Sequence, residues 1–275
     1  MLTKTAAQLK IPTLYHYQAF DKPKRFAQLF ANGALYFSNP RHFNDPWDCK
    51  PFFNRSALDD GAERERTIQW FVGNGRKHGP ALPEREHQRR EAELRSNRPL
   101  LESMIDDLSR EMDKAIQSQY RVFCLSRHPD STLMWAHYAA SCKGLCLEFS
   151  VQNSLCCGAL EVQYFDEYPL FSAHASDDDS NLRPLLSKSA AWKYEDEFRV
   201  IATEHPYVVD SIPTSMSGFV KLPTGAMTAV ILGPLMSQSD RALVRKIVVD
   251  SGWSIRLKEA RTVPDRYAFV ISDLQ

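Results

Sequence analysis

Ionisable side chains gather in one stretch of the chain, and their spacing suggests chemistry. Glu195, Glu197 and Arg199 alternate through the run from Lys188 to Ala202, whose second half is rich in β-branched and aromatic residues. That composition predicts a strand. Because side chains alternate across a strand, the glutamates and the arginine should share one face, with Phe198 in the core on the other. Two carboxylates and a guanidinium at this spacing can hold a ligand hydroxyl or stabilise a cationic transition state.

The same three residues also have a purely structural interpretation. Glu195, Glu197 and Arg199 would then neutralise one another in a cross-strand ladder of ion pairs on a solvated sheet face. The pattern alone favours this interpretation over a ligand site. Both remain open at the level of the sequence.

A second concentration of functional groups lies in the loop from Asn39 to Asp48, which contains two prolines. Stiffening by proline lowers the cost of ordering a binding loop, so Asn44 and Asp45 are candidate ligand-binding residues. In the alternative interpretation, Asn44 and Asp45 cap turns while Phe43 and Trp47 fill the core. The sequence does not decide between these two roles.

Composition limits the classes of function. The 275 residues are 43% hydrophobic and 25% charged, and Lys plus Arg equals Asp plus Glu at 34 each, so no net charge draws in nucleic acid. The N-terminal residues lack a signal-peptide pattern and no run reaches membrane-spanning length, which predicts a cytoplasmic protein with a small-molecule ligand and no membrane partner. The six cysteines have no Cys-x-x-Cys spacing, which argues against structural zinc and predicts free thiols.

The hydrophobic periodicity predicts an irregular alternation of strands and helices. Strands are expected at 14–17, 34–38, 121–126, 144–149, 159–165, 198–202, 226–233, 253–257 and 266–271, and helices at 23–31, 63–72, 84–95, 101–116, 133–140 and 239–249. On the strand at 144–149, Cys146 and Glu148 should face solvent or a cleft. The acidic run 176–180 should be a solvated loop. We therefore predict a single α+β domain over residues 1–275, with a mixed or antiparallel sheet and a helical insertion at about 59–119.

Several motifs, taken together, resemble a known family. They cover the chain from about residue 12 to residue 235, in an order and spacing similar to the bacterial domain-of-unknown-function family 2971. The motifs are Tyr36–Ser38, Phe43–Pro46, Leu133–Tyr138, Lys143–Cys146, Lys188 and Trp192–Arg199. Because the family is named for its unknown function, this resemblance implies a bacterial protein and no particular chemistry.

A second resemblance, to ADP-ribosyltransferase-like domains, does imply a chemistry. Those domains place a His or Arg on the first strand, an aromatic residue on a later one, and a catalytic Glu at the start of a late strand. By this resemblance His16 would bond the ribose beside nicotinamide, and Tyr36 would stack on nicotinamide. Glu197 would be the catalytic carboxylate, with Glu195 supporting acceptor choice and NAD as the substrate.

The implied reaction is consistent with a carboxylate, since breaking the glycosidic bond to nicotinamide builds oxocarbenium character. The expected binding residues are His16, Tyr36, Ser38, Asn44, Asp45 and Arg199. The phosphates would need Arg25, Arg41 or backbone amides. The chain also departs from the pattern, because it has no Ser-Thr-Ser triplet on a middle strand.

Three classes of function remain open. The first is NAD-consuming ADP-ribosyl transfer or NAD hydrolysis in bacterial defence or stress, with an unidentified acceptor. The second is a non-catalytic ligand-binding or sensing module. The third is a metal-dependent hydrolase or nuclease built on His42, Asp45 and Asp48, although no second ligand cluster accompanies these residues and no metal is expected.

Overall fold

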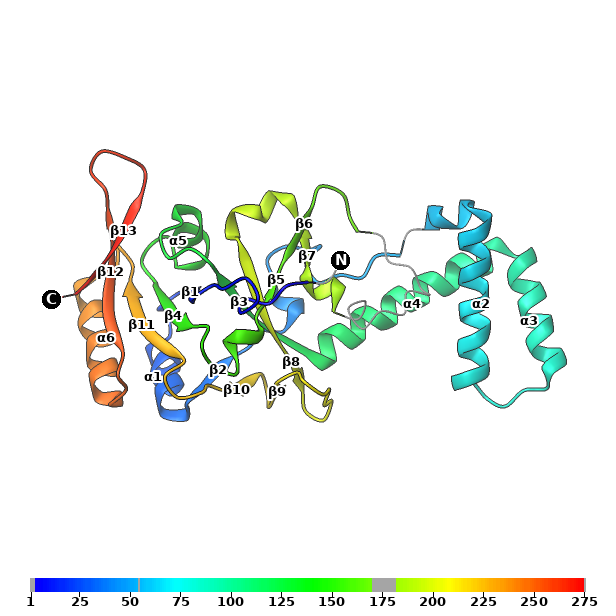
Figure 1. Cartoon of the computed structure of the whole chain (residues 1–275), viewed down its shortest axis with the longest axis horizontal. Coiled ribbons are helices and arrows are strands. Elements are labelled where there is room, and N and C mark those ends of the chain that lie inside the picture. The colour runs from blue at the N-terminus through cyan, green and yellow to red at the C-terminus, as the bar shows by residue number, and fades with distance from the viewer. Residues whose placement is uncertain (1–2, 54, 170–181, 275) are drawn as a thin grey trace.

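The computed structural model describes residues 3–53, 55–169 and 182–274. In this part of the chain, nine strands form one large mixed sheet, and two pairs of strands form smaller sheets (Figure 1). The large sheet contains β1 (Thr13–Gln18), β3 (Tyr120–Ser126), β4 (Leu145–Ser150), β5 (Leu160–Glu161), β8 (Glu197–Glu204), β9 (Thr214–Ser215), β11 (Met227–Leu232), β12 (Arg256–Thr262) and β13 (Phe269–Asp273). The smaller sheets pair β2 (Ala34–Tyr36) with β10 (Phe219–Lys221), and β6 (Gln163–Phe165) with β7 (Ser187–Ser189).

The strand order of the large sheet is β13-β12-β11-β4-β1-β3-β8-β5, with β9 also paired to β8. Most neighbouring pairs are antiparallel, while β11 with β12 and β8 with β9 are parallel. The helices are α1 (Pro23–Asn32), α2 (Gly61–His78), α3 (Glu84–Ser96), α4 (Arg98–Gln119), α5 (Thr132–Tyr138) and α6 (Gln238–Ser251). The shorter 3-10 helices include η1 (Pro40–His42), η2 (Arg55–Asp59), η3 (Cys156–Gly158), η5 (Arg183–Leu186) and η6 (Ala190–Glu195). The molecule is therefore an α+β protein with a mixed sheet, as predicted.

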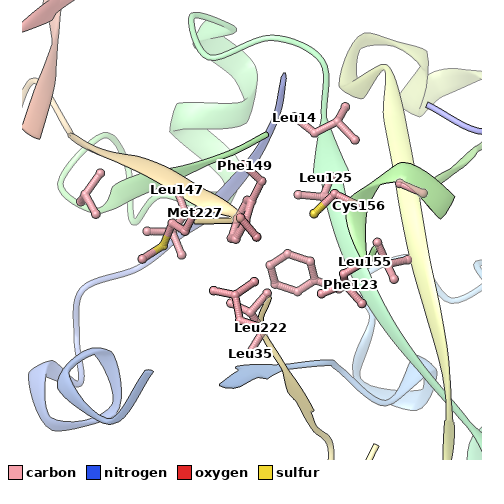
Figure 2. Close-up of a cluster of buried hydrophobic side chains, with 14 of the residues drawn as sticks. Leu14, Leu35, Phe123, Leu125, Leu147, Phe149, Leu155, Cys156, Leu222 and Met227 are labelled. Carbon is pink, nitrogen blue, oxygen red and sulfur yellow. The ribbon is translucent and has the colours of Figure 1, made fainter. Parts of the chain in front are cut away.

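The main hydrophobic core lies on one face of the large sheet. Leu147 and Phe149 of β4 and Phe123 of β3 are buried there (Figure 2). Residues of α1 and α6 belong to the same cluster, and Phe30 of α1 packs edge-on against Trp253. Burial of this much apolar surface is the main source of stability in a domain of this size.

The opposite face of β4 is also covered, which corrects the expectation that it faces solvent or a cleft. Cys146 is fully buried in a second cluster with Trp135 of α5 and Ile231 of β11. Glu148 is 3% exposed and forms an ion pair with Lys258 of the sheet at 2.6 Å. The sequence alternation could not reveal this, because the residues that cover the face come from distant parts of the chain.

Several element boundaries differ from those predicted. The strand expected at 159–165 is divided, since β5 pairs with β8 whereas β6 pairs with β7. The last two strands begin later than expected, at Arg256 and Phe269. Ser38 lies beyond β2 and forms only an isolated bridge with Val122. The acidic run 176–180 lies outside the described residues.

The predicted helical insertion consists of α2, α3 and α4, at one end of the molecule in Figure 1. α2 extends past the predicted end at residue 72, through Gly73 and Gly75. Ile68 and Val72 pack in a cluster with α3 and α4, and this burial outweighs a cost of about 1 kcal/mol for each glycine. The C-terminal half of α4 contacts the sheet, with Ile116 packed beside Val122 and Ile201. One continuous helix therefore connects the insertion to the sheet. Across the described residues, no helix combines the length and apolar character needed to cross a bilayer.

Candidate active site

A cavity of about 370 Å³ opens beside the large sheet, near the centre of its strand order. Its walls come from β1, the loop after β2, β3, α5, β7, η6 and β8. Six of the lining residues carry the chemistry: His16, Asn44, Asp48, Tyr138, Glu195 and Glu197. Lys188 and Arg199 also line it.

Strand pairing brings His16 and Glu197 to this one cavity. β3 pairs with β8 along its whole length, whereas β1 and β3 register only at Tyr15 opposite Ser126. Next to this single contact, the His16 ring stacks on Phe123 with centroids 4.3 Å apart, and its Nδ1 lies 2.8 Å from the carbonyl oxygen of Cys124. β1 and β8 therefore share a sheet, and His16 and Glu197 line a common cavity, which agrees with the expectation that both contact one ligand.

Glu195 reaches the cavity by a different route from the one predicted. The last residue of η6 is Glu195, and the next residue, Asp196, has a left-handed backbone with φ of 42°. β8 then begins at Glu197, so the strand alternation relates Glu197 to Arg199 only. The expectation that Glu195 continues the same strand face is wrong, because the left-handed residue turns the chain between the two glutamates.

The charged residues form one buried network rather than a solvated ladder. Arg199 is fully buried; its Nε donates to Glu197 Oε1 at 2.8 Å and its Nη2 donates to Asp48 Oδ2 at 2.7 Å. Lys188 Nζ donates to Glu197 Oε2 at 3.0 Å and also to Glu195 Oε2. The ion pairs of the structural interpretation are therefore present, but its solvated sheet face is not, since none of these five side chains is more than 5% exposed.

The two glutamates have opposite pKa shifts because their neighbours differ. Burial alone would raise the pKa of Glu197, but the positive charges of Arg199 and Lys188 outweigh it and hold that pKa far below its usual range. Burial, followed by repulsion from Glu197, raises the pKa of Glu195 to about 7, even though Lys188 contacts it. Near neutral pH, Glu197 is thus a fixed anion while Glu195 exchanges a proton.

A count of the charges in the network also indicates that Glu195 takes up a proton. Asp48, Glu195 and Glu197 supply three carboxylates, while Lys188 and Arg199 supply two cations, so the fully ionised network carries one net negative charge. An uncompensated charge in a poorly solvated site favours uptake of a proton. The Tyr138 hydroxyl donates to Glu195 Oε1, which directs that carboxylate into the cavity.

Tyr36 lies in a neighbouring cavity, not beside Glu197. This second cavity has a volume of about 320 Å³, and it shares His16 and Ser38 as lining residues with the first. The guanidinium carbon of Arg25 stands 4.4 Å from the centre of the Tyr36 ring. The expected stacking of Tyr36 on a nicotinamide close to Glu197 therefore does not match its position, whereas Arg25 does line a ligand-sized space.

The loop after β2 divides the predicted roles between its residues. Asn44 lines the first cavity together with Tyr138. Asp45 is buried and its Oδ1 accepts from the Trp47 N–H at 2.9 Å, which is the turn-capping role. Phe43 is half-buried: it packs against the cluster of Ile116 and Val122, in part as the structural alternative expected, and it also lines the cavity. Trp47 is 65% exposed and does not fill the core.

Three residues important to the site had no recognised role in the sequence. Lys188 and Tyr138 belonged to motifs without an assigned function, and Asp48 was considered only as a metal ligand. One signal in the sequence could have indicated the network. Lys188, Glu195 and Glu197 fall within ten residues, where a buried strand begins, and opposite charges at such a place suggest a cluster in which the charges compensate one another. The pairing of Asp48 with Arg199 spans 151 positions, so no local pattern contains it.

The candidate metal ligands do not converge. His42 Nε2 accepts from Arg41, Asp45 caps its turn, and Asp48 is held by Arg199. The described residues contain no group of three or more His, Cys, Asp or Glu side chains placed to hold a metal ion.

Comparisons with protein-family models, with curated proteins and with solved structures give no match to this chain. Both resemblances drawn from the motifs therefore stay predictions, and the function is argued from the cavity.

Proposed function

We propose that the protein is a NAD-consuming enzyme, catalysing ADP-ribosyl transfer or NAD hydrolysis, with Glu195 as its catalytic carboxylate. The observation that carries this proposal is the pKa of Glu195, raised to about 7 inside a ligand-sized cavity. A group with a pKa near the working pH is present in both protonation states, as acid–base catalysis requires. Glu197, which the resemblance favoured, instead acts as a positioning residue that holds Lys188 and Arg199.

The charge of the network suits this chemistry. The nicotinamide ring of NAD is a cation, and breaking its bond to ribose moves positive charge onto the sugar. With Glu195 ionised, the preorganised, buried network carries one net negative charge and stabilises that developing charge more strongly than water does. The hydrogen bonds from Lys188 and Tyr138 fix the Glu195 carboxylate, so no reorganisation is needed as the charge develops.

His16 is suited to bind a ribose hydroxyl. Burial lowers its pKa, so the ring is neutral at physiological pH. Because the Cys124 carbonyl can only accept, Nδ1 of the neutral ring carries the hydrogen and Nε2 is left as an acceptor. A sugar hydroxyl could donate to that nitrogen in the cavity that His16 shares with Glu195.

The two adjoining cavities fit an elongated substrate. The nicotinamide riboside end would occupy the cavity of Glu195, and the remainder would continue past His16 and Ser38. There Lys22 and Arg25 line the second cavity and supply the positive charge that a diphosphate requires. Incubation of the protein with NAD, followed by quantification of released nicotinamide, tests this assignment.

A ligand-binding module without turnover is the second candidate. It is favoured by the observation that both Glu195 oxygens already accept hydrogen bonds, from Tyr138 and from Lys188, as in a structural network. Calorimetric binding of NAD without nicotinamide release would support this candidate over the enzyme.

A further inference from the structure

Three aromatic side chains lie together beside the Glu195 cavity, and one of them, His137, lines it. The His137 ring of α5 lies 6.5 Å from Trp192 and 6.1 Å from Tyr194, and the Trp192 and Tyr194 rings of η6 are 6.0 Å apart, all between centroids. His137 is exposed and lines the cavity, while Trp192 and Tyr194 are half-buried. We call these three residues the aromatic rim.

The aromatic rim is in direct contact with the charge network. Lys188 Nζ lies 5.2 Å from the centre of the Trp192 ring, and the same ammonium bonds Glu195 and Glu197. Tyr138, which donates to Glu195, also has its ring beside that of His137. A ligand bound at the aromatic rim would therefore lie within the electrostatic field of the charge network.

We propose that the aromatic rim is a binding site for an organic cation. Aromatic faces carry negative charge density, and they attract cations most strongly where water is partly excluded. When Glu195 is ionised, the net negative charge of the network adds to this attraction and disfavours anionic ligands. The charge of Lys188 does not cancel it, because Lys188 is compensated by the two glutamates that it bonds. If the proposed function holds, the cation is the pyridinium ring of NAD; the site itself does not depend on turnover.

The proposal is tested with a pair of probes that share a ring and differ in charge. The cation 1-methylnicotinamide and neutral nicotinamide are titrated into the full-length protein by calorimetry. The cation should bind about tenfold more tightly. In Trp192→Ala this preference should be lost, and in Trp192→Phe most of it should remain. Trp70→Ala is the matched control, because Trp70 packs against Phe71 in α2 of the insertion and should keep the full preference.

Two results would overturn the proposal: equal or undetectable binding of the two probes by the wild type, or a preference that survives Trp192→Ala. Thermal melts of each variant exclude loss of folding as the cause, and Tyr194→Ala gives a second variant if Trp192→Ala proves unstable. The outcome is separable from the proposed function. A cation preference without NAD consumption would support the cation site and contradict the proposed enzymatic activity. NAD consumption without a cation preference would support the enzymatic activity and contradict the cation site.

Discussion

At the scale of single residues, Glu195 and Glu197 show how two glutamates in one motif acquire different roles. Glu197 bonds Arg199 and Lys188, and its pKa is lowered. Among the described residues, Glu195 has Lys188 as its one cationic partner, and its pKa rises to about 7. The motif predicted that both are near Arg199. It could not predict which one is fixed, because that depends on Asp48 and Lys188 in three dimensions.

The first prediction concerns Glu197. Glu197→Gln leaves Arg199 buried with one carboxylate partner fewer, so it should lower the free energy of unfolding by about 2–4 kcal/mol. Urea denaturation measures the loss, with the exposed Glu111→Gln as a control that should cost at most about 0.5 kcal/mol. Equal effects of the two substitutions would show that the buried network contributes little.

The second prediction concerns pH. The pKa of Glu195 rises from 4.5 to about 7 on folding, so between these values the folded protein binds more protons than the unfolded chain. The contribution of Glu195 to stability therefore falls as the pH increases from about 4.5 to 7. In Glu195→Gln this loss is absent, and the variant should gain up to about 3 kcal/mol relative to the wild type across that window.

Urea denaturation of both proteins at several pH values measures this difference. A stability gap between wild type and Glu195→Gln that does not change with pH would mean that Glu195 titrates at its ordinary pKa. In that case Glu195 would lose the property on which the proposed function rests.

At the scale of elements, two neighbouring residues in the loop after β2 have different roles: Asn44 lines the cavity, whereas Asp45 caps a turn. Asp45 accepts from the Trp47 N–H, so Asp45→Ala should cost about 1 kcal/mol of stability. NAD affinity should stay within twofold of the wild type, since Asp45 stands apart from the cavity lining. Thermal melts and calorimetry of the same preparation distinguish the two effects. A large loss of affinity at an unchanged melting temperature would restore the binding role.

The two halves of α4 should respond differently to truncation. Leu101 is fully buried in the insertion cluster, whereas Ile116 is buried against the sheet. Each substitution to Ala should cost about 2–4 kcal/mol. Hydrogen exchange should show that Leu101→Ala weakens protection mainly in α2 and α3, and that Ile116→Ala weakens the sheet amides as well. Identical exchange patterns would mean that the insertion and the sheet unfold as one unit.

Local patterns predicted most elements, because apolar periodicity and caps act over a few residues. α1 begins at Pro23 and ends before Gly33 as expected, and Ser131 caps α5. The failures involve distant partners: β6 leaves the large sheet for β7, and the second face of β4 is buried by α5. Propensity within the segment does not contain that information.

At the scale of the whole molecule, the site forms because strands that are distant in the sequence are near neighbours in the large sheet. β1 and β8 lie far apart in the sequence, at Thr13–Gln18 and Glu197–Glu204, and β3 lies between them in the sheet with a single register contact to β1. This arrangement places His16 at the junction of two cavities and Glu195 in one of them. The ADP-ribosyltransferase resemblance anticipated that His16 and Glu197 meet, but not that Glu195 is the titrating carboxylate.

The central claim is tested most directly by nicotinamide release from NAD at neutral pH, for the wild type, Glu195→Gln and Glu197→Gln. We predict that the wild type releases nicotinamide, with a rate that rises with pH through about 7 as Glu195 ionises. Glu195→Gln should lower turnover at least about 100-fold while remaining folded, and Glu197→Gln should retain more activity per folded molecule. A wild type that releases no nicotinamide, or a Glu195→Gln variant that is fully active, would contradict the assignment.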